Sequence, residues 1–121
     1  PASLDTLVAT NLHADILSDL AAALAGSLGI APTANLDPER RFPSMFEPIH
    51  GSAFDIMGKG LANPIGTFWS VVLMLEHLGH KEAAGAIMRA IECVLREGPR
   101  TRDIGGRAST QELGKAIAGA L

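Results

Sequence analysis

The sequence predicts an α/β fold that is mostly helical and contains a few strands. Good helix formers recur at helical spacing in four stretches, whereas two short runs have the character of buried strands. The 121 residues are enough to enclose one hydrophobic core. Two strands make a marginal sheet unless more are supplied from elsewhere, so this inventory is unusual for a self-contained domain.

The N-terminal part predicts a strand followed by a helix. Residues 4–10 form a short apolar run with β-branched side chains and no helix start signal, which indicates a buried strand. Residues 15–25 are rich in helix formers, with Ile16 and Leu20 on one stripe, and Gly26 ends this helix.

The middle of the chain predicts extended and irregular structure. Residues 29–43 are punctuated by Gly and Pro, so we expect an irregular crossing with an extended piece over residues 30–36. A second strand is expected at residues 45–50. The glycine-bearing stretch 51–60 then predicts a loop with at most one helical turn.

Three helices are expected in the C-terminal half. Asn63 as a cap and Pro64 at the first position open the first of them, which runs to Leu78 and is apolar on most of its circumference. Such a helix is buried in a core or an interface. Residues 81–97 form an amphipathic helix, and a last helix begins at Ser109, which forms a capping box with Glu112 three residues later.

The composition argues against several classes of protein. Ten basic and 13 acidic side chains give a net charge of −3, without the clustered basic excess of a nucleic-acid or membrane-surface protein. No apolar run is long enough to cross a bilayer and no signal peptide is recognisable. Cys93 is the single cysteine, which excludes an internal disulfide and fits a reducing compartment. We therefore expect a cytoplasmic protein.

Two aspartates four residues apart form the first candidate site. On a helix, Asp15 and Asp19 project from the same face about one turn apart. A divalent cation such as Mg²⁺ would turn their repulsion into binding. The alternative is that both carboxylates interact with the positive end of the helix dipole.

The stretch from Glu47 to Pro64 forms the second candidate site. After a strand that ends at His50, small residues let the backbone approach a ligand closely, and Asp55 can accept hydrogen bonds from ribose hydroxyls. The dinucleotide fingerprint GxGxxG is absent. By spacing alone, a polar turn and a nucleotide-binding loop both remain open.

Taken together, these segments resemble a known family. The stretches NLHADILSDLAAALAGSLGIAPTAN, FPSMFEPIHGSAFDIMGKGLANPIG, MLEHLGH and DIGGRAST are similar to the C-terminal part of isocitrate and isopropylmalate dehydrogenases. The segments PSMFEPIHGSA and MLEHLGH are most similar to those of family members that act on tartrate or D-malate. The resemblance covers nearly the whole chain.

The resemblance implies an oxidoreductase that uses NAD and Mg²⁺ or Mn²⁺ to oxidise and decarboxylate a small 2-hydroxy acid. Asp15 and Asp19 match the paired metal ligands of the family. The residues that match its cofactor loop are His50, Gly51, Ser52, Ala53, Asp55, Ile56 and Asn63. NADP-using relatives carry a basic residue and a tyrosine where this chain has Asp55 and Ile56, so NAD is expected.

The resemblance also implies how the chain is organised. Residues 1–28 would supply a strand and helix of the smaller dimerisation domain, and residues 29–121 the C-terminal half of the larger NAD-binding domain. We expect a homodimer. The family's substrate-binding arginines and its catalytic tyrosine and lysine match no position here, so no catalytic residue is assigned. The chain, which starts at Pro1, is expected to be an incomplete enzyme that is inactive alone. The alternative is a non-catalytic nucleotide-binding or association module.

Overall fold

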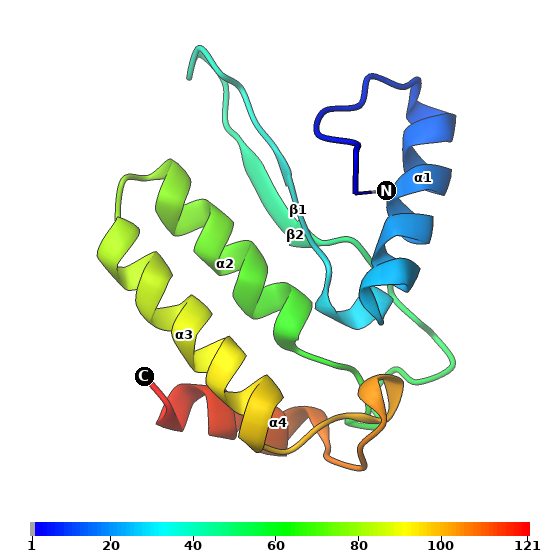
Figure 1. The fold of residues 1–121 in the computed structure, drawn as a ribbon, viewed down its shortest axis with the longest axis vertical. Helices are drawn as coiled ribbons and strands as arrows, with labels where there is room; N and C mark the ends of the chain where they lie inside the picture. The colour runs from blue at the N-terminus through cyan, green and yellow to red at the C-terminus, as the bar shows by residue number, and fades with distance from the viewer. Residues whose placement is uncertain (1) are drawn as a thin grey trace.

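A computed structural model describes residues 2–121, and Pro1, the first residue of the predicted 1–28 unit, lies outside that range. Within it the chain is mostly helical with one small sheet, which confirms the predicted fold class (Figure 1). The elements are α1 (Asn11–Ala25), the 3₁₀ helix η1 (Leu28–Ile30), β1 (Pro32–Asn35), β2 (Met45–Pro48), α2 (Ile65–His77), α3 (Lys81–Glu97), the 3₁₀ helix η2 (Arg102–Ile104) and α4 (Thr110–Gly119). None of the helices in residues 2–121 has the length and apolar character needed to cross a bilayer.

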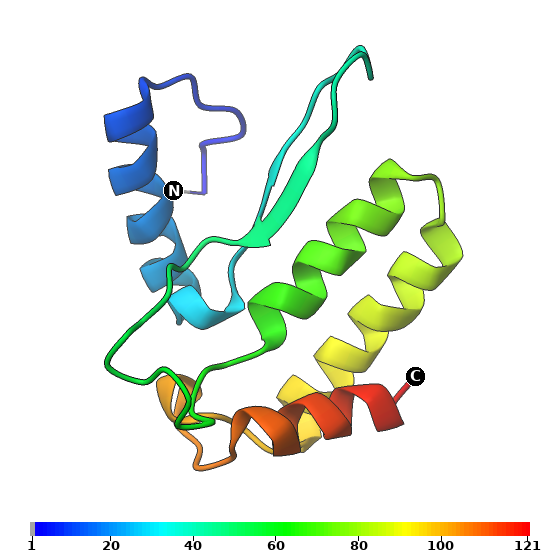
Figure 2. The same ribbon diagram turned by 180° about the vertical axis from the view of Figure 1, so that it is seen from behind.

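Helix α2 lies at the centre of the arrangement. It contacts α3 on one side and both strands on the other, while α4 packs against α3 (Figures 1 and 2). The strands form an antiparallel hairpin in which Pro32 lies opposite Pro48 and Asn35 opposite Met45. This placement between two partners explains why the α2 sequence is apolar on most of its circumference.

The core forms where α2, α3 and α4 meet. Its fully buried side chains come from all three helices and are Ile65, Ile91, Leu113 and Ile117. Ile30 and Ile104, from the two 3₁₀ helices, pack at its edge. The core therefore ties both 3₁₀ segments to the helical layer.

Several local predictions are confirmed. Gly26 follows α1 with a φ of 123°, which a side chain would disfavour, and α3 has the predicted bounds. The backbone N–H of Ser109 donates to the Glu112 carboxylate at 2.8 Å, and the Ser109 hydroxyl accepts from the Glu112 N–H at 3.2 Å. The predicted capping box is therefore present.

The predicted strand at residues 4–10 is wrong. This segment has no regular structure, and Leu4, Leu7 and Val8 are exposed. A strand needs a partner for its backbone groups, and within residues 2–121 only β1 and β2 pair. Within residues 2–121 this segment therefore has no neighbouring strand with which to pair.

Two helix starts also differ from the prediction. Helix α1 begins at Asn11, four residues earlier than expected, so Asp15 lies beyond the first turn and the dipole explanation for it loses force. Helix α2 begins at Ile65, but Asn63 still accepts its N–H at 3.0 Å, as a capping residue does.

Truncation of Leu113 to alanine tests the core. Because Leu113 is fully buried among three helices, we expect Leu113→Ala to lower the free energy of unfolding by about 3 kcal/mol. Urea titration followed by circular dichroism measures this loss. Leu121→Ala, at an exposed position just after α4, is the matched control and should change stability by less than about 0.5 kcal/mol. Equal losses in both variants would contradict the assigned core.

Candidate functional site

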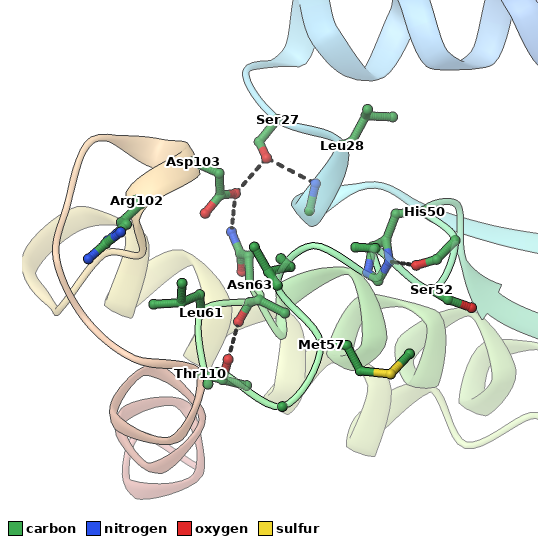
Figure 3. A pocket seen from close by; sticks show the side chains of 17 residues that line it. Ser27, Leu28, His50, Ser52, Met57, Leu61, Asn63, Arg102, Asp103 and Thr110 are labelled. Atoms are coloured by element: carbon green, nitrogen blue, oxygen red, sulfur yellow. Dashed lines mark hydrogen bonds between the residues drawn. The ribbon is translucent and has the colours of Figure 1, made fainter.

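A cleft of about 850 Å³ opens where four segments far apart in the sequence meet. They are the corner after α1, the loop that follows β2, η2 and the first residue of α4 (Figure 3). Its volume is in the range of small-molecule and cofactor sites. The lining residues are Ser27, Leu28, Gly29, His50, Gly51, Ser52, Ala53, Ile56, Met57, Gly58, Gly60, Leu61, Ala62, Asn63, Arg102, Asp103 and Thr110.

Six of the seven residues predicted to bind the cofactor line this one cleft. They are His50, Gly51, Ser52, Ala53, Ile56 and Asn63. Asp55 is not among the lining residues. It is exposed on the adjoining turn, where its backbone carbonyl accepts a hydrogen bond from the Lys59 ammonium at 2.6 Å. The cleft therefore brings together most, but not all, of the predicted set.

The loop after β2 follows a path that depends on special backbone conformations. Ala53 has a φ of 43°, in the left-handed region that residues with a side chain rarely adopt. The Ala53 carbonyl accepts the N–H of Ile56 at 2.9 Å and so closes a turn. Cβ atoms added at Gly51, Gly58 and Gly60 would meet only open space, so the backbone at all three borders accessible volume. A ligand can therefore approach this backbone closely.

The start of α4 fixes the far end of the loop. The Thr110 N–H donates to the Gly60 carbonyl at 2.8 Å, and the Thr110 hydroxyl donates to the Ala62 carbonyl. Together these two hydrogen bonds attach the start of α4 to the loop, and we call them the Thr110 clamp. The part of the loop that contains Gly60 and Ala62 is therefore attached to the helical core.

One wall of the cleft is a polar junction, which we define as Ser27, Gly29, Asn63 and Asp103. Oδ2 of Asp103 accepts the Ser27 hydroxyl at 2.5 Å and the Asn63 amide Nδ2 at 2.9 Å (Figure 3). The Ser27 hydroxyl in turn accepts the Gly29 N–H at 2.9 Å. One carboxylate oxygen thus joins the corner after α1, the start of α2 and η2.

Both polar ends of the Asn63 side chain are engaged inside the chain. Its amide donates to Asp103, and its carbonyl oxygen accepts the Ile65 N–H. The residue is only 6% exposed. We conclude that Asn63 lines the cleft as a fixed structural group, with its backbone as the part most available to a ligand.

The polar junction has no spare room. A Cβ at Gly29 would lie 2.8 Å from the Asn63 Cβ and 2.9 Å from Asp103 Oδ2. Both distances are shorter than a Cβ tolerates. Glycine is therefore required at position 29 for the Asp103 and Asn63 side chains to meet.

Asp103 is stabilised in its charged form. Burial raises the pKa of its carboxyl, but the polar groups of Ser27, Thr101 and Asn63 stabilise the carboxylate, and the net pKa lies below 3.8. The fully buried Thr101 hydroxyl makes no hydrogen bond within the described residues. Asp103 is therefore ionised at neutral pH.

The two predicted metal ligands lie away from this cleft, on α1. Asp15 and Asp19 are both exposed and one turn apart, and their hard oxygen atoms suit Mg²⁺ or Mn²⁺. Residues 2–121 contain no group of three or more His, Cys, Asp or Glu side chains able to hold a metal ion. The pair therefore fits a cation that takes one or two carboxylates and completes its shell with water or substrate oxygens.

The sequence reasoning missed Ser27, Asp103 and Thr110 as parts of the cleft. Each comes from a segment remote from the loop after β2, and spacing along the chain carries no information about such proximity. The signal available was the DIGGRAST stretch, which contributed to the family resemblance and contains Asp103.

Comparison with families and sequences of known proteins gives consistent matches. The family model described as isocitrate/isopropylmalate dehydrogenase matches residues 1–117. An Agrobacterium vitis protein described as "Probable tartrate dehydrogenase/decarboxylase" is 69% identical over the whole chain. D-malate dehydrogenase (decarboxylating) of Escherichia coli strain K12 is 52% identical over 97% of the chain. The chain spans 34% of the length of each of these two relatives.

A solved structure supports the same relationship. Isocitrate dehydrogenase from Methylococcus capsulatus superimposes with a TM-score of 0.86 at 41% sequence identity. The match covers 92% of this chain and 33% of that one.

The charge on Asp103 predicts a pH dependence of stability. Because its pKa is lower in the folded state, the carboxylate stabilises the fold above the unfolded-state pKa of 3.8, and this contribution disappears as pH falls through the lower folded-state value. We expect the stability difference between the wild type and Asp103→Asn to be constant from pH 7 to about pH 5 and to shrink below about pH 4. Urea unfolding at each pH measures it.

The comparison with Asp103→Asn is needed because other acids titrate in the same range. Hydrogen bonds from the Phe42 N–H and the Ser109 N–H lower the pKa of Asp37 and Glu112, respectively. A difference between wild type and variant that does not change with pH would show that the Asp103 charge is unimportant.

Proposed function

The chain belongs to the isocitrate/isopropylmalate dehydrogenase family, and on this premise we propose that it forms the NAD-binding part of a decarboxylating 2-hydroxy-acid dehydrogenase. The relatives named as tartrate and D-malate dehydrogenases favour a substrate of that type. NAD would accept the hydride, and Mg²⁺ or Mn²⁺ would supply a Lewis acid. The chain spans about a third of its relatives, so the activity proposed is that of the whole enzyme.

The observation that carries this proposal is the gathering of His50, Gly51, Ser52, Ala53, Ile56 and Asn63 on one cleft. The family resemblance assigns all six to the cofactor loop from the sequence alone. The cleft volume of about 850 Å³ suits a large part of a dinucleotide. The open space beside the backbone at Gly51, Gly58 and Gly60 suits a phosphate-bearing ligand that needs close approach.

Different residues of the loop would contact different parts of NAD. The small residues Ser52 and Ala53 let the backbone approach the adenosine and the pyrophosphate. Asp55, one residue before the cleft-lining Ile56, would accept hydrogen bonds from the ribose hydroxyls and repel a 2′-phosphate. Asn63 would contact the adenine.

Asp15 and Asp19 would hold the divalent cation together with groups outside this pair. Their exposure on one face of α1 leaves the coordination shell open to substrate oxygens. We assign no general acid or base to this chain. Residues 1–28 would belong to the smaller dimerisation domain of the enzyme and residues 29–121 to its NAD-binding domain.

A homodimer and a cytoplasmic location are also part of the proposal. One stripe of α1 exposes apolar side chains at four-residue spacing, namely Leu12, Ile16, Leu20 and Leu24. Such a stripe costs free energy in water and suits a second copy of the chain. A single, exposed cysteine suits a reducing compartment.

Calorimetric titration of the chain with NAD tests the proposed function. We expect NAD to bind, and Asp55→Ala to weaken binding roughly tenfold because hydrogen bonds from the ribose hydroxyls to a charged acceptor are lost. The same variant should bind NADP better relative to NAD, since the repulsion of the 2′-phosphate is removed.

Glu92→Ala is the matched control, because Glu92 is an exposed carboxylate on α3 outside the cleft. It should leave both affinities unchanged. Absence of NAD binding by the wild type, or an equal effect of the two variants, would contradict the assignment.

A further inference from the structure

We propose that Asp103 is a positioning residue of the NAD cleft, because it holds Ser27 and Asn63 on one carboxylate oxygen and thereby fixes the wall that receives the adenosine half of the dinucleotide. This inference rests on the proposed function and adds to it a residue from outside the loop after β2. Asp103 need not touch the cofactor in order to act in this way.

In the polar junction, two hydrogen bonds between residues far apart in the sequence share one acceptor atom, Oδ2 of Asp103. Ser27 and Asn63 lie 76 and 40 residues from Asp103 in the sequence, yet both donate to its Oδ2. Hydrogen bonds to a charged acceptor are stronger than neutral ones. Removal of this oxygen would leave the Ser27 hydroxyl and the Asn63 amide without their shared acceptor.

Each of the two donor side chains also accepts a hydrogen bond from a backbone N–H group. The Ser27 hydroxyl also accepts the Gly29 N–H and so fixes η1, and the Asn63 carbonyl oxygen accepts the Ile65 N–H and so fixes the start of α2. Ser27, Gly29, Asn63 and Asp103 all line the cleft. The shape of this wall therefore depends on the hydrogen bonds that meet at Asp103.

The close packing at Gly29 removes alternative arrangements. Asp103 Oδ2 would lie only 2.9 Å from a Cβ at that position, so the carboxylate occupies the space that a side chain would fill. If the carboxylate were absent, the corner after α1 could move toward the start of α2. The backbone of Asn63, which is proposed to contact the adenine, would then lose its fixed position.

The effect should be confined to one half of the dinucleotide. The polar junction includes Asn63, the proposed adenine contact, whereas the nicotinamide half would extend away from it. Loss of Asp103 should therefore weaken binding of AMP as much as binding of NAD and leave binding of nicotinamide mononucleotide unchanged. A general loss of structure would weaken all three.

Calorimetric titrations of the full 121-residue chain with NAD, AMP and nicotinamide mononucleotide provide the test. For Asp103→Ala we expect a roughly tenfold loss of affinity for NAD and AMP and none for the mononucleotide. Asp103→Asn keeps an acceptor oxygen but removes the charge, so its loss should be smaller. Asp5→Ala, at an exposed carboxylate outside the cleft, is the matched control.

Hydrogen exchange provides a readout that does not require a ligand. In Asp103→Ala the amides of Gly29 and Ile65 should exchange faster than in Asp5→Ala, while the amides of α3 should not change. Ser27→Ala should accelerate the Gly29 amide alone. If Asp103→Ala does not fold, Asp103→Asn carries the same comparisons with smaller expected effects, and Ser27→Ala carries the comparison at Gly29.

Two results would overturn the proposal. One is an unchanged affinity for AMP together with unchanged exchange at Gly29 and Ile65. The other is an equal loss of affinity for AMP and for the mononucleotide. Failure of the wild type to bind NAD contradicts the proposed function instead, and the exchange rates at Gly29 and Ile65 then decide alone whether Asp103 holds the junction.

Discussion

A single carboxylate oxygen, Oδ2 of Asp103, joins three segments that lie far apart in the sequence. The corner after α1, the start of α2 and η2 meet on it through Ser27 and Asn63. The arrangement is possible because position 29 is a glycine, whose missing side chain leaves the carboxylate its space. The cleft exists because these segments meet, and the loop after β2 closes its other side.

The rest of the fold supports this junction to different degrees. The core of α2, α3 and α4 is fully buried, and the Thr110 clamp links it to the loop that follows β2. The N-terminal part is different, since residues 4–10 pair with no strand in the described part of the chain and α1 exposes an apolar stripe. The two metal-ligand candidates therefore lie on an element with an exposed apolar stripe, whereas the cofactor candidates lie on a loop that Thr110 attaches to the helical core.

Local features of this fold were predictable from sequence because their causes are local. The capping box of Ser109 and Glu112, the stop at Gly26 and the bounds of α3 each depend on neighbours within a few residues. The strand at residues 4–10 was predicted wrongly because strand formation depends on a partner that composition does not reveal. The role of Asp103 was missed for the same reason, since its contacts span 40 and 76 residues.

The most direct test of this account is to map the NAD site on the chain by NMR. Titration of the ¹⁵N-labelled chain with NAD should shift the amide signals of Gly51, Ser52, Ala53 and Asn63, with smaller effects at Gly29, while signals of α3 stay in place. This pattern would establish the cleft beside Asp103 as the cofactor site. Shifts confined to other elements, or none at saturating NAD, would contradict it.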